Sequence, residues 1–184
     1  VKKHLEVFLD WPPDVLSLRE DLLALIYLIG MFVSAFGVGL FFPRTSRRKA
    51  LMIADTITIF AIPLNFLNPY PVFLAGRFFL GFASGLNYVV CPVHIREMSP
   101  PEIRDFLGSM NSGGMILGCL VATLLSLKIS SDPYSNDHHW MMMFIAPGVV
   151  SLFRLIILRT VYYYDSPKYY TLFDKYDLAL RSEE

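Results

Sequence analysis

The sequence predicts an all-α fold, a polytopic bundle of about five transmembrane helices. Hydrophobic residues make up 54% of the 184 residues and charged residues only 17%, a balance that soluble domains of this length rarely have. Leu22–Phe42 and Phe106–Leu127 contain no charged residue. Each has the length of about 20 residues that an α-helix needs to cross a hydrocarbon layer of roughly 30 Å. The runs lack the alternation of barrel strands, so helices are the expected form.

Apolar character divides the chain into five expected spans: Leu22–Phe42, Ala50–Leu67, Val72–Val93, Phe106–Leu127 and Trp140–Tyr162. The helix bundle is therefore expected over residues 21–163. Residues 1–20 are expected to form an exterior or interfacial segment. Residues 164–184 are expected to form an inner-face tail in which Phe173–Leu180 is a short amphipathic helix on the membrane surface.

The charges of the connecting segments predict the orientation in the membrane. Four cations and no acid follow the first span (Arg44, Arg47, Arg48 and Lys49), whereas the turn at residues 68–71 is uncharged. Cations gather again at the end of the fifth span and beyond it, at Arg159, Lys168, Lys175 and Arg181. By the positive-inside rule these two segments, and the mixed loop after the third span, face the cytoplasm or its organellar equivalent. The N-terminus is then outside and the C-terminus inside.

Small residues mark two faces where helices are expected to approach closely. Gly81 and Gly85 are four residues apart in the third span, and Gly114 and Gly118 repeat that spacing in the fourth. Residues four apart lie on one face of a helix, and glycines there let two backbones come together. Both pairs are therefore expected to serve helix packing.

Three charged residues, Asp55, Arg77 and Arg154, fall inside apolar runs. A charged side chain at the bilayer centre costs at least about 2.5–3.5 kcal/mol, so all three are expected nearer a helix end. Snorkelling or a structural ion pair is favoured over a direct role in transport, which stays open.

Several classes of function are disfavoured. The net charge of +0 gives no basic field for nucleic acid. Cys91 and Cys119 lie in apolar stretches and are expected to be small hydrophobic residues rather than metal ligands or a disulfide. The four histidines (His4, His94, His138 and His139) lack the helical spacing of metal ligands. The sequence also contains no nucleophile elbow and no phosphate loop. No metal, cofactor or enzymatic activity is therefore expected.

Three motifs occur in order along residues 22–170. The central one reads GRFFLGFASGLNYVVCPVHIREMSPPEIRDFLGSMNSGGMILG, with matching positions at Gly76, Arg77, Gly81, Gly85, Pro92, Glu97, Pro100, Arg104 and Gly118. GLFFPRTSRRKAL precedes it, and Asp165-Ser166-Pro167-Lys168-Tyr169 follows. This order and spacing resemble the sugar porters of the major facilitator superfamily. The resemblance implies a partial N-terminal half of that fold, with the five spans as family spans two to six and the first span absent.

The resemblance also implies a charge network at the inner face, carried by Arg47, Arg48, Arg77, Glu97, Arg104, Asp165 and Lys168. Within it, Glu97 and Arg104 could pair across the Pro100-Pro101 break. The chain departs from the family pattern at Pro43, which replaces an acid, and at Asp105, which replaces a glycine. Ser112 stands where sugar porters usually carry a sugar-binding glutamine, and a hydroxyl cannot replace the paired donor and acceptor of an amide.

Two functions are therefore considered. The leading hypothesis is a degenerate sugar-transporter-like protein that does not transport alone and serves as a structural or accessory subunit of a larger membrane complex. The alternative is a fragment of a working facilitator for a sugar or another small polar solute. The expected partners are the lipid bilayer and other membrane subunits, with a solute substrate doubtful and no nucleic acid. The membrane is either an organellar one, such as the mitochondrial inner membrane, or the plasma membrane.

Overall fold

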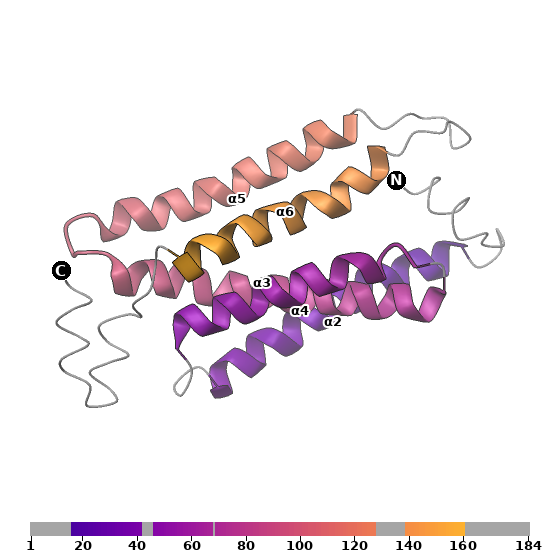
Figure 1. Cartoon of the computed structure of the whole chain (residues 1–184), viewed down its shortest axis with the longest axis horizontal. Helices are drawn as coiled ribbons and strands as arrows, with labels where there is room; N and C mark the ends of the chain where they lie inside the picture. Colours follow the sequence, from indigo (N-terminus) through magenta and orange to yellow (C-terminus); the bar gives the residue numbers. More distant parts are fainter. Residues whose placement is uncertain (1–15, 42–45, 68, 128–138, 161–184) are drawn as a thin grey trace.

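The structure is a computed structural model that describes residues 16–41, 46–67, 69–127 and 139–160. These ranges contain five helices and no strand (Figure 1). The helices are α2 (Leu16–Phe41), α3 (Arg47–Leu64), α4 (Tyr70–Met98), α5 (Arg104–Leu127) and α6 (His139–Thr160). The all-α, multi-helix prediction is confirmed.

The helices extend beyond the predicted apolar runs. Helix α4 has 29 residues, which at 1.5 Å per residue is about 44 Å and exceeds the hydrocarbon thickness. It starts behind Pro69 at the N-cap and continues to Met98, because backbone hydrogen bonding does not stop where the apolar side chains stop. Helix α2 begins at Leu16, so residues 16–20 of the expected exterior segment are helical. The rest of that segment and the tail at 164–184 lie outside the described residues.

Three of the described helices are long and apolar enough to cross a membrane by length and composition. They correspond to Asp21–Leu40, Tyr70–Met98 and Arg104–Leu124, with mean hydropathies of 2.2, 1.5 and 1.4. Helix α3 is not among them, because it carries three cations in its first turn and Asp55. Among the described side chains, length and apolar character therefore support three of the five expected spans.

Helix α4 organises the bundle. It packs along α2 on one side and α3 on another, and α3 in turn contacts α6. Helix α5 makes the sparsest contacts, with α4 and α6, and lies along the upper edge of the view in Figure 1. A buried apolar cluster of Val38, Leu51, Val90 and Leu158 joins α2, α3, α4 and α6.

The α2–α4 interface depends on glycine. A Cβ atom at Gly85 would lie 2.6 Å from the carbonyl oxygen of Met31, and one at Gly81 would lie 2.9 Å from the carbonyl carbon of Tyr27. On α2, a Cβ at Gly30 would lie 2.9 Å from the backbone nitrogen of Phe82. Real side-chain carbons do not approach backbone atoms this closely, so these three positions accept only glycine without a shift of the helices.

The outer faces of the helices are apolar and exposed. Leu40 is 77% exposed, Phe60 70% and Ile116 72%. A water-soluble bundle would place polar side chains at such positions. The apolar exterior is instead what a bundle surrounded by lipid requires.

Candidate functional site

One end of the bundle is fastened by an ion pair between α3 and α4. Arg47 Nε lies 3.0 Å from Glu97 Oε2, and Arg47 Nη2 donates to Glu97 Oε1 at 3.2 Å. The two side chains are only 8% and 10% exposed. The first turn of α3 is thereby attached to the last turn of α4, although 50 residues separate them.

A second contact attaches α6 at the same end. Arg48 Nε donates to the carbonyl oxygen of Leu158 at 2.9 Å. The last carbonyl groups of a helix have no partner within that helix, so a cation there satisfies one of them. Ser46 sets the position of both arginines, because its Oγ accepts from the backbone N–H of Lys49 as the N-cap of α3. We call the four residues Arg47, Arg48, Glu97 and Leu158 the cationic-end cluster.

The expected pairing of Glu97 with Arg104 is not what the structure shows. Glu97 is bound by Arg47, and Arg104 Nη2 donates at 3.4 Å to the carbonyl oxygen of Ser99. The physical reason is the direction in which the two side chains point. The Glu97 side chain points from α4 toward α3, whereas the Arg104 side chain, which follows the Pro100-Pro101 break, points back to Ser99 at the end of α4.

Arg77 does not belong to this cluster. It lies 20 residues before Glu97 on α4, which is about 30 Å along the helix and therefore near its opposite end. Its guanidinium carbon is 5.2 Å from the centre of the Phe73 ring, a cation–π distance. Asp165 and Lys168, the remaining residues of the expected network, lie outside the described residues.

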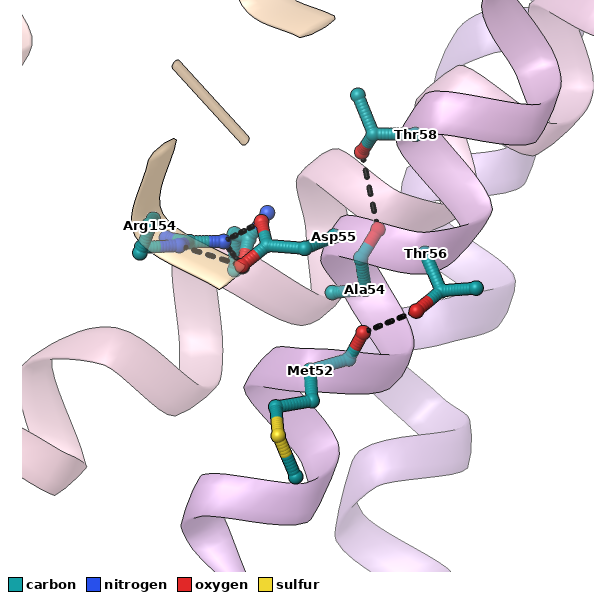
Figure 2. A network of polar contacts seen from close by, with 7 residues as sticks. Met52, Ala54, Asp55, Thr56, Thr58 and Arg154 are labelled. Carbon is teal, nitrogen blue, oxygen red and sulfur yellow. Dashed lines mark hydrogen bonds and ion pairs between the residues drawn. The ribbon is translucent and has the colours of Figure 1, made fainter. Parts of the chain in front are cut away.

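A second polar site joins α3, α4 and α6 inside the bundle. Arg154 Nε donates to Asp55 Oδ2 at 2.9 Å, and Arg154 Nη2 also binds Asp55 Oδ1 (Figure 2). The same Nη2 donates to Asn87 Oδ1 at 2.7 Å. Asp55 is fully buried, and the Arg154 side chain is 33% exposed. A two-point arginine–carboxylate contact of this kind fixes geometry as well as charge.

The position of Asp55 corrects the expectation that it lies near a helix end. Because Ser46 caps α3 and the helix runs Arg47–Leu64, Asp55 lies in its middle, about 12 Å from the first residue. The two neighbouring hydroxyls are already satisfied within α3, where Thr56 donates to Met52 and Thr58 to Ala54 (Figure 2). Of the alternatives left open by the sequence, a structural ion pair is what Asp55 and Arg154 form.

A cavity of about 560 Å³ lies beside this ion pair, between α4, α5 and α6. Its polar lining consists of Asn87, Ser151 and Arg154. The rest is apolar or glycine: Gly114, Leu117, Gly118, Val121, Ala122, Ala146, Pro147 and Val150. We call it the Arg154 cavity.

The second glycine pair, Gly114 and Gly118, lines this cavity and does not lie in a contact between helices. No heavy atom beyond the local helix backbone lies within 4 Å of a Cβ placed on Gly114 or Gly118. Their expected packing role thus has no partner among the described residues, because α5 packs loosely. Ser112 is exposed on α5 and is not a lining residue.

The sequence reasoning singled out Asp55 and Arg154 but not their partnership, and it missed Asn87. The available signal was the presence of opposite charges in two apolar runs. Nothing in the sequence distinguishes Asn87 from other polar residues of α4.

The cysteines and histidines form no site in the described ranges. Cys91 is half-buried with Sγ 3.8 Å from Asn111 Oδ1, and Cys119 is exposed. Neither is in a disulfide. Among the side chains that the structure describes, no group of three or more His, Cys, Asp or Glu residues could hold a metal ion. His4, His138 and the side chain of His139 lie outside that part of the chain.

A lipid-facing helix bundle with a buried ion pair beside a cavity is typical of membrane transport proteins. The family described as "Sugar (and other) transporter" matches residues 9–183. The chain therefore belongs to this family, and it is an integral membrane protein of the sugar-porter group of the major facilitator superfamily.

Curated relatives are facilitated glucose transporters. The chain is 29% identical over 150 residues to solute carrier family 2 member 1 of Gallus gallus, covering 79% of this chain and 30% of the relative. It is 25% identical over 162 residues to member 4 of Homo sapiens, covering 86% and 31%. The chain thus spans about three-tenths of the length of the curated relatives it matches.

Solved structures show the same fold. The xylose transporter XylE, a proton:xylose symporter described with bound 6-bromo-6-deoxy-D-glucose, superposes with a TM-score of 0.77 at 23% identity. That match covers 98% of this chain and 44% of XylE. A partially occluded, inward-open form of XylE from E. coli gives 0.70 at 24% identity, over 85% and 42%. The described bundle is therefore part of one half of a major-facilitator fold.

Proposed function

We propose that this chain supplies one helix bundle of a sugar-porter-type facilitator and acts in the passage of a sugar or another small polar solute together with a second bundle. The observation that carries the proposal is the ion pair between Arg47 and Glu97. These residues come from two separate family motifs, and they meet in space with little exposure. The contact supports the proposal because it joins two motifs that the sugar-porter resemblance assigns to one charge network.

A second bundle is part of the proposal because facilitators bind their solute between two halves and alternate access by rocking one against the other. The second bundle can come from the same polypeptide or from another chain. The relatives' longer sequences support this division, since the chain matches about three-tenths of each.

An accessory subunit of a larger membrane complex is the second candidate. It is favoured by the exposed Ser112 at the family's glutamine position and by the unoccupied glycine face of α5. A partner helix could pack on that face, and the loss of the amide would matter little to a protein that binds no sugar.

Purification from native membrane, followed by uptake into proteoliposomes, tests both candidates. For a facilitator, the native assembly should take up D-glucose or D-xylose in a saturable manner and prefer it over the L-enantiomer, and Glu97→Gln should reduce the rate. For an accessory subunit, the chain should co-migrate with a large complex that shows no such uptake. Saturable, stereoselective uptake by the chain alone would refute the need for a second bundle. Fractionation in the same experiment would assign the plasma membrane or an organellar one.

A further inference from the structure

Helices α3 and α6 meet along a seam whose one end carries two exposed cations. Lys49 lies in the first turn of α3, and Arg159 lies in the last turn of α6. Their neighbours in sequence bind each other, because Arg48 Nε donates to the carbonyl oxygen of Leu158. Lys49 and Arg159 are therefore held at the same end of the bundle, where the start of α3 meets the end of α6 (Figure 1).

Neither of these two cations is neutralised within the described part of the chain. Arg47, two residues before Lys49, is paired with Glu97 and is almost buried. The Lys49 and Arg159 side chains are exposed instead, and no described acidic residue lies within ion-pair distance of either. An excess of positive charge therefore remains at this end of the seam.

An apolar groove of about 370 Å³ runs along the outer side of α3 from Lys49. Its other lining residues lie three, four, seven and eight positions after Lys49 and hence on the same helix face. The Thr56 hydroxyl already donates to the carbonyl oxygen of Met52, so it is not available to a ligand. The groove thus offers a cation at one end and an apolar surface along the rest. We call it the α3 groove, lined by Lys49, Met52, Ile53, Thr56 and Ile57.

A second groove, of about 240 Å³, continues this path between α3 and α6. Thr56 of the α3 groove and Ile59 and Pro63 of the second groove are spaced three and four residues apart, so they share one face of α3. On α6, Leu152 lies seven residues before Arg159, on the same face and about 10 Å away along the helix. Both grooves therefore lead to the end that carries the two cations. We call the second one the seam groove, lined by Ile59, Ile62, Pro63, Ile145, Gly148, Val149 and Leu152.

The occupant that matches both the charge and the apolar surface is an anionic phospholipid. Acyl chains cover the exposed apolar side chains of a membrane protein, and anionic headgroups are attracted to cations beside the membrane surface. The positive-inside rule predicts that this end of the bundle faces the cytoplasm, and the cytoplasmic leaflet contains the anionic lipids. A zwitterionic lipid would fill the grooves as well but would gain little from the two cations.

We propose that the outer seam between α3 and α6 binds an anionic phospholipid. Its phosphate lies between Lys49 and Arg159, and one acyl chain lies along the α3 groove and the seam groove. The proposal goes beyond the proposed function, because it applies equally to a facilitator and to an accessory subunit.

The first test counts the lipids bound to the full chain by native mass spectrometry in detergent. The probes are palmitoyl-oleoyl phosphatidylglycerol and palmitoyl-oleoyl phosphatidylcholine, which have the same acyl chains and differ in net charge. Each lysine or arginine near an anionic lipid is worth about fivefold in affinity, so the phosphatidylglycerol should bind about 30-fold more tightly. Inorganic phosphate in excess should not displace it, because phosphate does not fill the grooves. Equal binding of the two lipids, or displacement by phosphate alone, would overturn the proposal.

Charge-neutral variants assign the difference to the two cations. Lys49→Gln and Arg159→Gln should each weaken phosphatidylglycerol binding about fivefold, and the double variant about 30-fold, with phosphatidylcholine binding unchanged. Arg96→Gln is the matched control. Arg96 is an exposed cation in the last turn of α4, at the same end of the bundle, and lines neither groove. A loss in Arg96→Gln as large as in Lys49→Gln would show attraction to the general positive charge of this end and would refute the site.

Photo-cross-linking locates the acyl chain. A phosphatidylglycerol with a diazirine in the middle of one acyl chain is added to membranes that contain the full chain, and the adducts are mapped by peptide mass spectrometry. Adducts should concentrate on residues 52–63 and 145–152 and should decrease at least about fivefold in the Lys49→Gln, Arg159→Gln double variant. Adducts spread equally over the exposed face of α2 would show only a general layer of lipid, and a seam without adducts would show that another protein segment covers it. Either result overturns the proposal.

Discussion

Arg154 of α6 binds Asp55 of α3 through two guanidinium nitrogens, across 99 residues of sequence. The pair has a structural consequence for both helices, because each carries one of the two charges inside an otherwise apolar stretch. Each becomes compatible with a bilayer because its internal charge is matched by the other helix.

Breaking this pair should destabilise the bundle strongly. Arg154→Leu leaves the fully buried Asp55 carboxylate without its cation, and loss of one partner of a buried pair costs about 3–5 kcal/mol. The effect is measured by thermal unfolding of the purified chain in detergent, with the loss of the monodisperse peak as the measure of unfolding. The double variant Asp55→Leu, Arg154→Leu should recover most of the loss, since no charge then remains buried. A double variant as unstable as the single one would contradict this account.

The Arg47–Glu97 contact should show direct energetic coupling. In a double-mutant cycle with Arg47→Gln and Glu97→Gln, we expect an interaction energy of about 1–3 kcal/mol, the range for contacting residues with little exposure. The matched comparison is a cycle between Glu97→Gln and Arg104→Gln. It should give less than about 0.5 kcal/mol, because Arg104 donates to the carbonyl of Ser99 instead. A larger coupling energy between Glu97 and Arg104 than between Glu97 and Arg47 would instead support the Glu97–Arg104 pair expected from the sequence.

The two glycine pairs should respond differently to substitution. Gly85→Val introduces carbons that would lie within 2.6 Å of the Met31 carbonyl oxygen, and overpacking of this kind typically costs about 1–3 kcal/mol. Gly118→Val meets open space and should change the unfolding temperature little. The comparison is made on the isolated chain. If Gly118→Val is as harmful as Gly85→Val, another helix occupies the α5 face.

The orientation of the bundle can be measured by one-sided labelling. Lys49 lies in the first turn of α3, and Pro69 lies beyond the other end of that helix; both residues are exposed. In a background without Cys91 and Cys119, the Lys49→Cys thiol should react only from the cytoplasmic side, where the cations gather, and the Pro69→Cys thiol only from the opposite side. Reaction of both thiols from one side would show that α3 does not cross the membrane.

Much of the fold could be predicted from the sequence because it follows from local physics. Long apolar runs must form helices in lipid, so the number and order of the helices follow from composition. Helix ends were predicted less well. The apolar run in the third span stops near Val93, but α4 continues to Met98, since helical hydrogen bonding extends into the interface where charged side chains are solvated.

The candidate site was only partly predictable. The sequence marked Asp55 and Arg154 as charges in apolar runs, and it marked Gly81 and Gly85 as a smooth helix face. It could not pair Asp55 with Arg154, add Asn87, or separate Arg77 from Glu97, since those facts depend on which helix faces meet.

By itself the sequence determined that this protein is a helical membrane protein of the sugar-porter family, because apolar length and motif order are properties of the linear chain. The tertiary structure decided what the internal charges do. It brought α3 and α6 together so that Arg154 neutralises Asp55, and it directed one glycine pair against α2 and the other toward a cavity. The physical reason is that a contact between distant segments is fixed by the relative rotation of whole helices, which no local pattern of residues specifies.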